Sequence, residues 1–120
     1  MFGFKKKATD TPSGDHEVRD FEADVIEASR TRPVLVDFWA PWCGPCRMLG
    51  PTLEQLAAES DGAWTLVKVN TDVHPDLAAR YEVRGIPTVK LFIDGEPVDG
   101  FLGALPAFAV KRWLKKALPS

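Results

Sequence analysis

The chain has 120 residues, of which 45% are hydrophobic and 27% charged. This length suits one domain with its own core, and the composition excludes a disordered, collagen-like or coiled-coil chain. The formal net charge of -2 leaves no overall positive field, and no apolar run is long enough to span a bilayer, so neither nucleic acid nor a membrane is an expected partner.

Residues 1–15 mix polar, charged and small residues without an apolar period, so we expect a flexible tail outside the fold. Lys5, Lys6 and Lys7 stand where a signal peptide needs its apolar stretch, which favours a cytoplasmic protein. A run of this length is also too short for a polybasic membrane anchor. We expect a single domain over residues 16–120, working as a monomer.

Strand and helix patterns alternate along the first half of this domain. A short strand is expected at 17–19 and a helix at 21–29, where apolar residues recur at helical spacing. The near-continuous apolar run at 34–39 is typical of a central strand covered on both faces. A second helix follows Cys46, and Pro51 is expected to kink it.

The second half continues with a buried-type strand at 64–70 and a short helix that begins at Pro75. A hairpin is expected from 89–93 to 97–101, and Pro106 opens a last amphipathic helix. Alternating strands and helices favour parallel pairing, and the hairpin adds an antiparallel pair. The sequence therefore predicts an α/β fold, with a mixed sheet of about five strands flanked by four helices.

The two cysteines stand three positions apart. If Cys43 begins the second helix and Cys46 lies one turn in, their side chains share a face and need only a small adjustment to form a disulfide. A ring this small stabilises a fold by only about 2 kcal/mol. The spacing therefore favours a bond that opens and closes over a structural staple.

Position also divides the roles of the two sulfurs. The unpaired N–H groups and the dipole at a helix N-terminus favour a thiolate, and a free thiol with a pKa of about 8.5 is mostly protonated at neutral pH. We therefore expect Cys43 to be the attacking sulfur and Cys46 to lie deeper.

The segment at 36–46, VDFWAPWCGPC, resembles the active-site segment of thioredoxins. The similarity spans roughly residues 16–118. It implies the thioredoxin fold and a thiol-disulfide oxidoreductase that reduces disulfides in client proteins, receives electrons from NADPH through thioredoxin reductase, and holds no cofactor besides its own redox-active disulfide. Further matches to the family are Pro51, Lys68, the GIPT loop at 85–88 and the Gly103-Ala104 turn.

The resemblance also implies a role for each matching residue. Cys43 attacks the client disulfide, and Cys46 then displaces the client. Asp37 is the buried carboxylate that helps take the proton of Cys46, with Lys68 near enough to modulate its charge. Ile86-Pro87 resembles a cis-proline loop that pairs with the substrate chain. The expected substrate-binding residues are Trp42, Gly44, Pro45, Ile86, Pro87, Gly103 and Ala104.

Other interpretations stay open at this stage. Asp37 would be an ordinary acid if it stood at an exposed strand end, although a charge within a buried-type strand is costly. Lys68 would be structural if its long chain simply reached solvent. The metal alternative is a zinc site, whose candidate ligands are Cys43, Cys46, His16 and His74. The two histidines lack the close spacing of zinc motifs, so no metal is expected.

The sequence also departs from the family pattern. Gly50 is more flexible than the apolar residue expected before Pro51. The segment at 99–106 resembles the thioredoxin domain of certain tetratricopeptide co-chaperones, which hold unfolded clients. The alternative function is therefore a client-binding module in which the cysteines are secondary.

Overall fold

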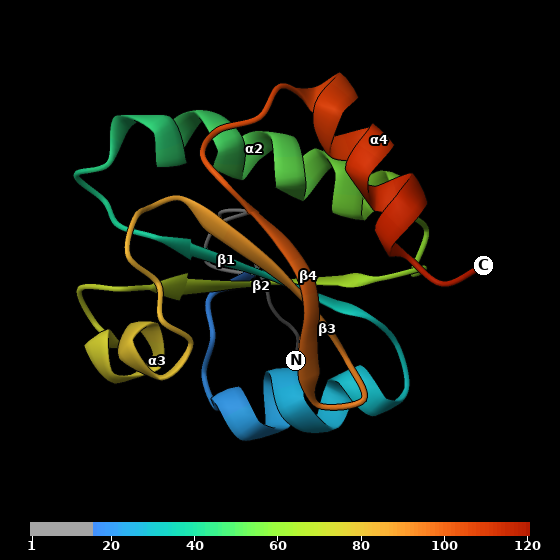
Figure 1. The fold of residues 1–120 in the computed structure, drawn as a ribbon, viewed down its shortest axis with the longest axis horizontal. Coiled ribbons are helices and arrows are strands. Elements are labelled where there is room, and N and C mark those ends of the chain that lie inside the picture. The colour runs from blue at the N-terminus through green and yellow to red at the C-terminus, as the bar shows by residue number, and fades with distance from the viewer. Residues whose placement is uncertain (1–15) are drawn as a thin grey trace, which may run out of the picture.

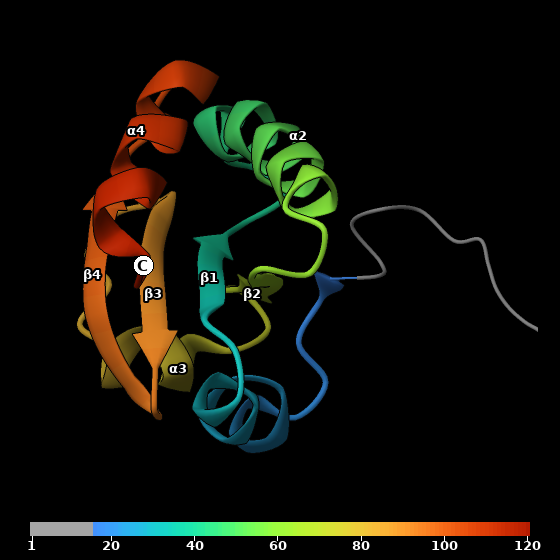
Figure 2. The ribbon, with the colours of Figure 1, turned by 90° about the vertical axis from the view of Figure 1, so that its right-hand side faces the viewer.

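The computed structural model describes residues 16–120, which form a four-stranded mixed sheet between two layers of helices (Figures 1 and 2). The tail predicted at 1–15 lies outside the described residues. The order across the sheet is β2-β1-β3-β4, with β1 parallel to β2 and antiparallel to β3, and β3 antiparallel to β4. The strands are β1 (Val34–Trp39), β2 (Thr65–Asn70), β3 (Thr88–Ile93) and β4 (Glu96–Leu102).

Helices cover both faces of this sheet. Figure 2 shows α2 and α4 over one face, with η1 and α3 over the other. Within the described part of the chain, no helix is both long and apolar enough to cross a membrane. The helical elements are the π-helix η1 (Glu22–Glu27), the 3₁₀ turn η2 (Ala28–Arg30), α2 (Gly44–Glu59), α3 (Pro75–Arg80) and α4 (Ala107–Ala117).

The strand predicted at 17–19 is wrong, so the sheet in the described residues has four strands where about five were expected. Only Glu17 pairs with the sheet, as an isolated bridge to Lys68. The carboxylate of Asp24 then accepts a hydrogen bond from the N–H of Arg19 (2.9 Å). This local bond turns the chain into η1 before a second residue can pair with β2.

Alternation along β1 sends its side chains into two separate cores. Leu35 packs on the face covered by α2 and α4, where Leu53 lies. Phe38 packs on the opposite face with Phe21. The helix predicted at 21–29 therefore turns its apolar residues inward as expected, although its hydrogen bonding is that of a π-helix followed by a 3₁₀ turn.

The long helix α2 contains Pro51 in its interior. Because proline has no N–H, the carbonyl of Arg47 lacks its usual helical donor. Gly50 is buried, and a Cβ atom at this position would lie 3.2 Å from Nζ of Lys68. The glycine thus lets α2 pack closely against a buried lysine, a role that its flexibility alone did not predict.

Candidate active site

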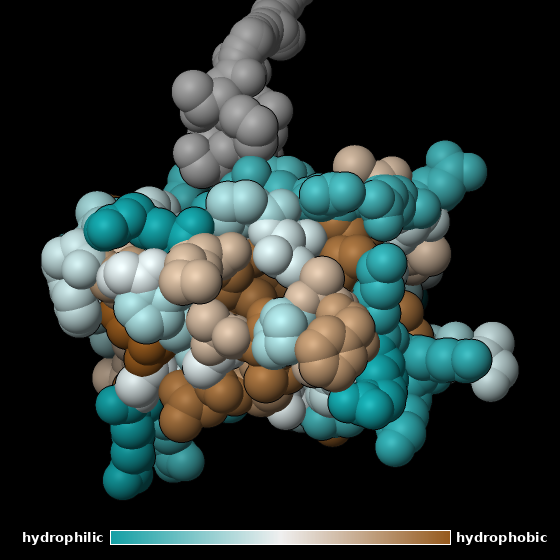
Figure 3. All heavy atoms as spheres, turned by 90° about the horizontal axis from the view of Figure 1, so that it is seen from above, coloured by the Kyte–Doolittle hydropathy of each residue, from teal (hydrophilic) through white to brown (hydrophobic). Residues whose placement is uncertain are grey.

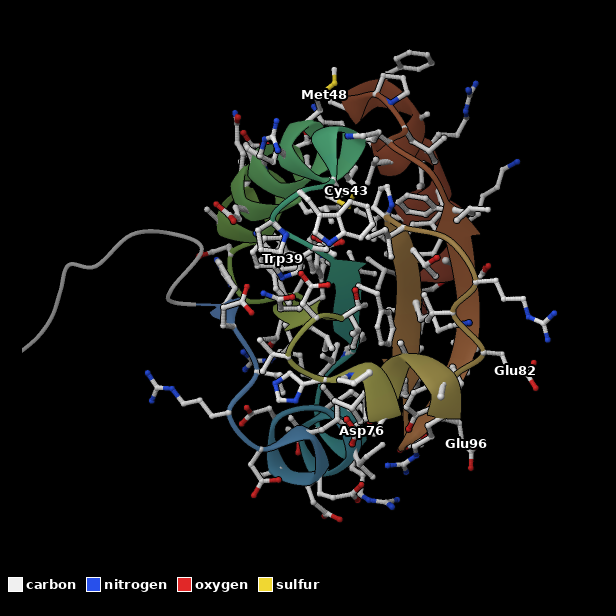
Figure 4. All side chains as sticks on the ribbon, turned by 90° about the vertical axis from the view of Figure 1, so that its left-hand side faces the viewer. Trp39, Cys43, Met48, Asp76, Glu82 and Glu96 are labelled. Atoms are coloured by element: carbon white, nitrogen blue, oxygen red, sulfur yellow. A yellow bond between two sulfur atoms is a disulfide. The ribbon has the colours of Figure 1, made fainter. Side chains whose placement is uncertain are left out.

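Cys43 and Cys46 form a disulfide at the start of α2, just beyond the carboxyl end of β1 (Figure 4). Cys43 is the N-cap residue, and its sulfur accepts a hydrogen bond from the N–H of Cys46 (3.2 Å). Their Cα atoms are 5.2 Å apart, which confirms the pairing that the spacing predicted. Both residues are buried, at 4% and 3% exposed, so the closed disulfide does not show the greater depth expected for Cys46.

The loop before β3 lies against this disulfide. The Ile86-Pro87 peptide bond is cis, as the resemblance implied. Ile86 packs against the cluster of Ala40, Cys43 and Cys46. Its carbonyl oxygen lies 3.8 Å from Sγ of Cys43. A substrate chain that reached Cys43 would therefore pass beside the backbone of Ile86.

The residues expected to bind substrate differ in exposure. Trp42 is 69% exposed, and its Nε1 donates a hydrogen bond to Asp72 (3.2 Å). Trp42 and Ile86 line one shallow pocket of about 410 Å³. The N–H of Gly103 bonds the carbonyl of Pro87 (2.8 Å), which ties the turn before α4 to the cis-proline loop. Pro45 and Ala104 are exposed, Gly44, Ile86 and Gly103 are partly exposed, and Pro87 is buried.

Apolar side chains also reach the surface above α2 and α4. Figure 3 shows them gathered among charged residues on this face. Met48 of α2 is 73% exposed and Phe108 of α4 is 66% exposed. Met48 lies five residues after Cys43 along α2, and Figure 4 labels both residues.

Asp37 is a buried acid on the face of β1 that α2 covers. It is 1% exposed, and neither carboxylate oxygen has a hydrogen-bond partner among the described residues. Burial raises the pKa of Asp37 from 3.8 to about 7, although Lys68 lowers it in part. Glu17 and Glu54 raise it further. The alternative of an acid at an exposed strand end is therefore excluded.

Lys68 is buried as well, at 5% exposed, beside Asp37 in the register of β1 and β2. Its Nζ donates to Oε2 of Glu54 (3.0 Å) and lies 4.9 Å from the ring centroid of Trp39. The lysine does not reach solvent, and its direct partner is Glu54. Glu54 was not among the predicted site residues, and its one signal in the sequence is its place about two turns after Cys46 on α2.

An open depression of about 320 Å³ is lined by Cys46 and by the ion pair of Lys68 with Glu54. Water that enters it reaches both Cys46 and the ion pair of Lys68 with Glu54. Its lining residues are Trp39, Cys46, Arg47, Gly50, Pro51, Glu54 and Lys68.

The zinc alternative finds no site in residues 16–120, where no group of three or more His, Cys, Asp or Glu side chains is arranged to hold a metal ion. Nδ1 of His16 lies 3.2 Å from the carbonyl oxygen of Leu66. His74 is the N-cap residue of α3 and makes no side-chain capping bond there. Neither histidine joins the cysteines.

Comparison with known proteins identifies the family to which this site belongs. The family model described as Thioredoxin matches residues 14–116. The chain belongs to the thioredoxin family. It is 47% identical over 100 residues to Thioredoxin of Griffithsia pacifica, covering 83% of this chain and 90% of that protein. It is 47% identical over 98 residues to Thioredoxin 1 of Synechococcus elongatus, covering 82% and 90%. It is 41% identical over 113 residues to Thioredoxin M2, chloroplastic, of Arabidopsis thaliana, covering 94% and 61%.

Family membership and the Cys43–Cys46 disulfide together define the activity. Thioredoxins reduce protein disulfides with a dithiol of their own and carry no bound cofactor. This protein is therefore a thiol-disulfide oxidoreductase that acts as a protein-disulfide reductase. The predicted thioredoxin fold is confirmed, with four strands in its mixed sheet across the part of the chain described.

Proposed function

We propose that Cys43 opens the client disulfide and that Cys46 completes the exchange. The Cys43 thiolate attacks one client sulfur, forming a mixed disulfide, and the second client sulfur leaves as a thiolate that takes up a proton. The Cys46 thiolate then attacks Sγ of Cys43 and releases the first client sulfur. The client gains two electrons, which the dithiol loses as its disulfide closes. The N-cap position of Cys43 carries this proposal, because the start of α2 favours a thiolate there.

Asp37 serves as the proton acceptor for Cys46 in this scheme, through an intervening water. Its pKa, raised to about 7 by burial, suits a base that works near neutral pH. The depression gives water access to Cys46 and to Lys68, which is the strand neighbour of Asp37. Lys68 tempers the proton affinity of Asp37, because it lies beside the acid without bonding it.

Electrons reach the dithiol from NADPH through thioredoxin reductase, and the clients are proteins with accessible disulfides. They dock on the exposed residues around the sulfurs, of which Trp42 is the largest. The domain at 16–120 works as a monomeric electron carrier in the cytoplasm, without nucleic acid or membrane partners. Its formal net charge of -2 supports the absence of polyanionic partners.

Replacing single cysteines tests this assignment. With NADPH and thioredoxin reductase, the wild-type protein should reduce insulin in many turnovers. Cys46→Ser should stop turnover and accumulate a mixed disulfide with the client, because no second sulfur releases it. Cys43→Ser should form little mixed disulfide. The measurements are NADPH consumption and mass spectrometry of the trapped complex.

The client-binding alternative predicts a different result. A wild-type protein that failed to reduce insulin, combined with client holding that persisted in a Cys43→Ser, Cys46→Ser double variant, would contradict the proposed cycle.

A further inference from the structure

The segment before η1 places an acid beside the buried charges of the site. The backbone of Glu17 forms an isolated β-bridge with Lys68 on one side of β2. On the other side of β2, Lys68 lies in strand register with Asp37 of β1. Residues in register on neighbouring strands project to the same face of a sheet. Glu17, Lys68 and Asp37 therefore form an acid-base-acid row on the face where Glu54 of α2 bonds the lysine.

The carboxyl group of Glu17 is partly buried in the fold. Its Oε2 atom is shielded from solvent and has no hydrogen-bond partner among the described residues. Burial raises the pKa of Glu17, and Lys68 lowers it in part. Attachment of this segment to the sheet does not require the side chain, because the N–H of Val18 already bonds the carbonyl of Lys68 (2.9 Å).

The single ammonium group of Lys68 therefore interacts with several carboxyl groups. Lys68 bonds Glu54 directly, and the charges of Asp37 and Glu17 also interact with it. Removing charges from water is costly unless each is paired, so the acids compete for the positive charge of the lysine. Ionisation of one acid weakens the support that the lysine gives to the others.

We propose that Glu17 is a positioning residue for the reduction. Its negative charge offsets part of the positive charge of Lys68, and Asp37 therefore binds the proton of Cys46 more strongly. In this step the proton passes from Sγ of Cys46 to the Asp37 carboxylate, and no electrons move. The role rests on the proposed function of Asp37. The charged groups that act on Asp37 are Lys68 of β2, Glu17 of the segment before η1 and Glu54 of α2. Cys46 lies about two turns before Glu54 on the same face of α2.

Glu17→Gln tests this role, because glutamine keeps the shape of glutamate and removes its charge. In the oxidised protein, the titration midpoint of Asp37, followed by NMR of its carboxyl carbon, should fall by about half a unit, which is about a threefold loss of proton affinity. A mixed disulfide of Cys43 with thionitrobenzoate reports the second step. The pH profile of its release by Cys46 should move down by a similar amount.

Three further variants control the experiment. Glu22→Gln is the matched control, because the Glu22 side chain is 64% exposed and pairs with Arg80, and it should leave both midpoints in place. Glu54→Gln removes the direct partner of Lys68 and should move both midpoints in the same direction as Glu17→Gln. If Glu17→Gln does not fold, Glu17→Met fills a similar space without charge and should give the same shift.

An Asp37 midpoint that stays in place in the Glu17 variants would overturn the proposal. A lowered midpoint with an unchanged pH profile of release would also overturn it. The NMR titration does not depend on catalysis, whereas the insulin assay of the wild-type protein tests the proposed function. Failure of the proposed role of Glu17 is therefore distinguishable from failure of the proposed function.

Discussion

At the scale of single residues, Asp37 is the side chain whose chemistry depends most on its surroundings. It stands in a strand that is otherwise apolar, and both of its oxygens are buried without a partner among the described residues. Such a carboxyl is easier to keep neutral than charged. The site therefore contains an acid that binds its proton more tightly than free aspartate does.

This proton affinity predicts how stability depends on pH. The pKa of Asp37 is raised from 3.8 to about 7, so its stabilising contribution is complete below the lower value and is lost as pH rises through the upper one. Asp37→Asn keeps the shape and removes the charge. At about pH 8 it should raise the free energy of unfolding by about 4 kcal/mol, and at about pH 3 it should change it little.

Urea unfolding of both proteins across this pH range measures the effect. Parallel stability curves for Asp37→Asn and the wild type would contradict it, because they would mean that Asp37 titrates alike in the folded and unfolded states. The same variant should also slow the release of the mixed disulfide.

At the scale of elements, α2 brings together the sulfur and the buried charges. Cys46, Gly50 and Glu54 follow one another at intervals of four and share a face of the helix. The first belongs to the disulfide, the second leaves room for Lys68, and the third bonds it. A single helix thus connects the dithiol to the charged row on the sheet.

Gly50→Ala tests the packing between α2 and the sheet. Alanine is favoured over glycine in a helix interior by about 1 kcal/mol. Its Cβ would lie 3.2 Å from Nζ of Lys68, the end of a flexible chain that can shift by a few tenths of an ångström. We therefore expect the variant to gain about 0.5 to 1 kcal/mol in unfolding free energy, measured in urea.

Gly44→Ala is the matched control for this change, because a Cβ there meets nothing within 4 Å in the first turn of the same helix. It should show no loss from steric contact. If Gly50→Ala proved clearly destabilising while Gly44→Ala was tolerated, Lys68 could not yield to α2 as argued.

At the scale of the whole molecule, the disulfide contributes little to folding. Cys43 and Cys46 are separated by only three positions, so the bond restricts the unfolded chain only slightly. The two cores on either side of the sheet supply the main apolar burial. The fold is therefore expected to persist in both redox states, as repeated thiol-disulfide exchange requires.

Chemical unfolding with and without a strong reductant tests this expectation. The oxidised protein should be more stable by about 2 kcal/mol, the value expected for closing so small a ring. Near-ultraviolet circular dichroism should show native packing in both states. Loss of that packing on reduction would mean that the disulfide is a structural staple after all.

Much of the fold followed from local patterns in the chain. The apolar run at 34–39 is β1, and the hairpin turn falls at Asp94 and Gly95, both of which adopt the positive φ that such a turn requires. The dithiol followed from the cysteine spacing, and its place at the start of α2 from the apolar pattern of the helix expected there. These features are local, because periodicity, turn residues and helix caps act over a few neighbouring positions.

The partners of the buried charges could not be predicted from such local patterns. Glu17 was placed in a strand that does not form, and nothing in the amino-acid order indicated that Glu54 would bond Lys68. Whether an acid is buried, and which cation it shares, depends on strand register and on how closely a helix packs. Those contacts join residues distant along the chain. Desolvation shifts the pKa of an acid only after folding has buried the group beneath the surrounding elements.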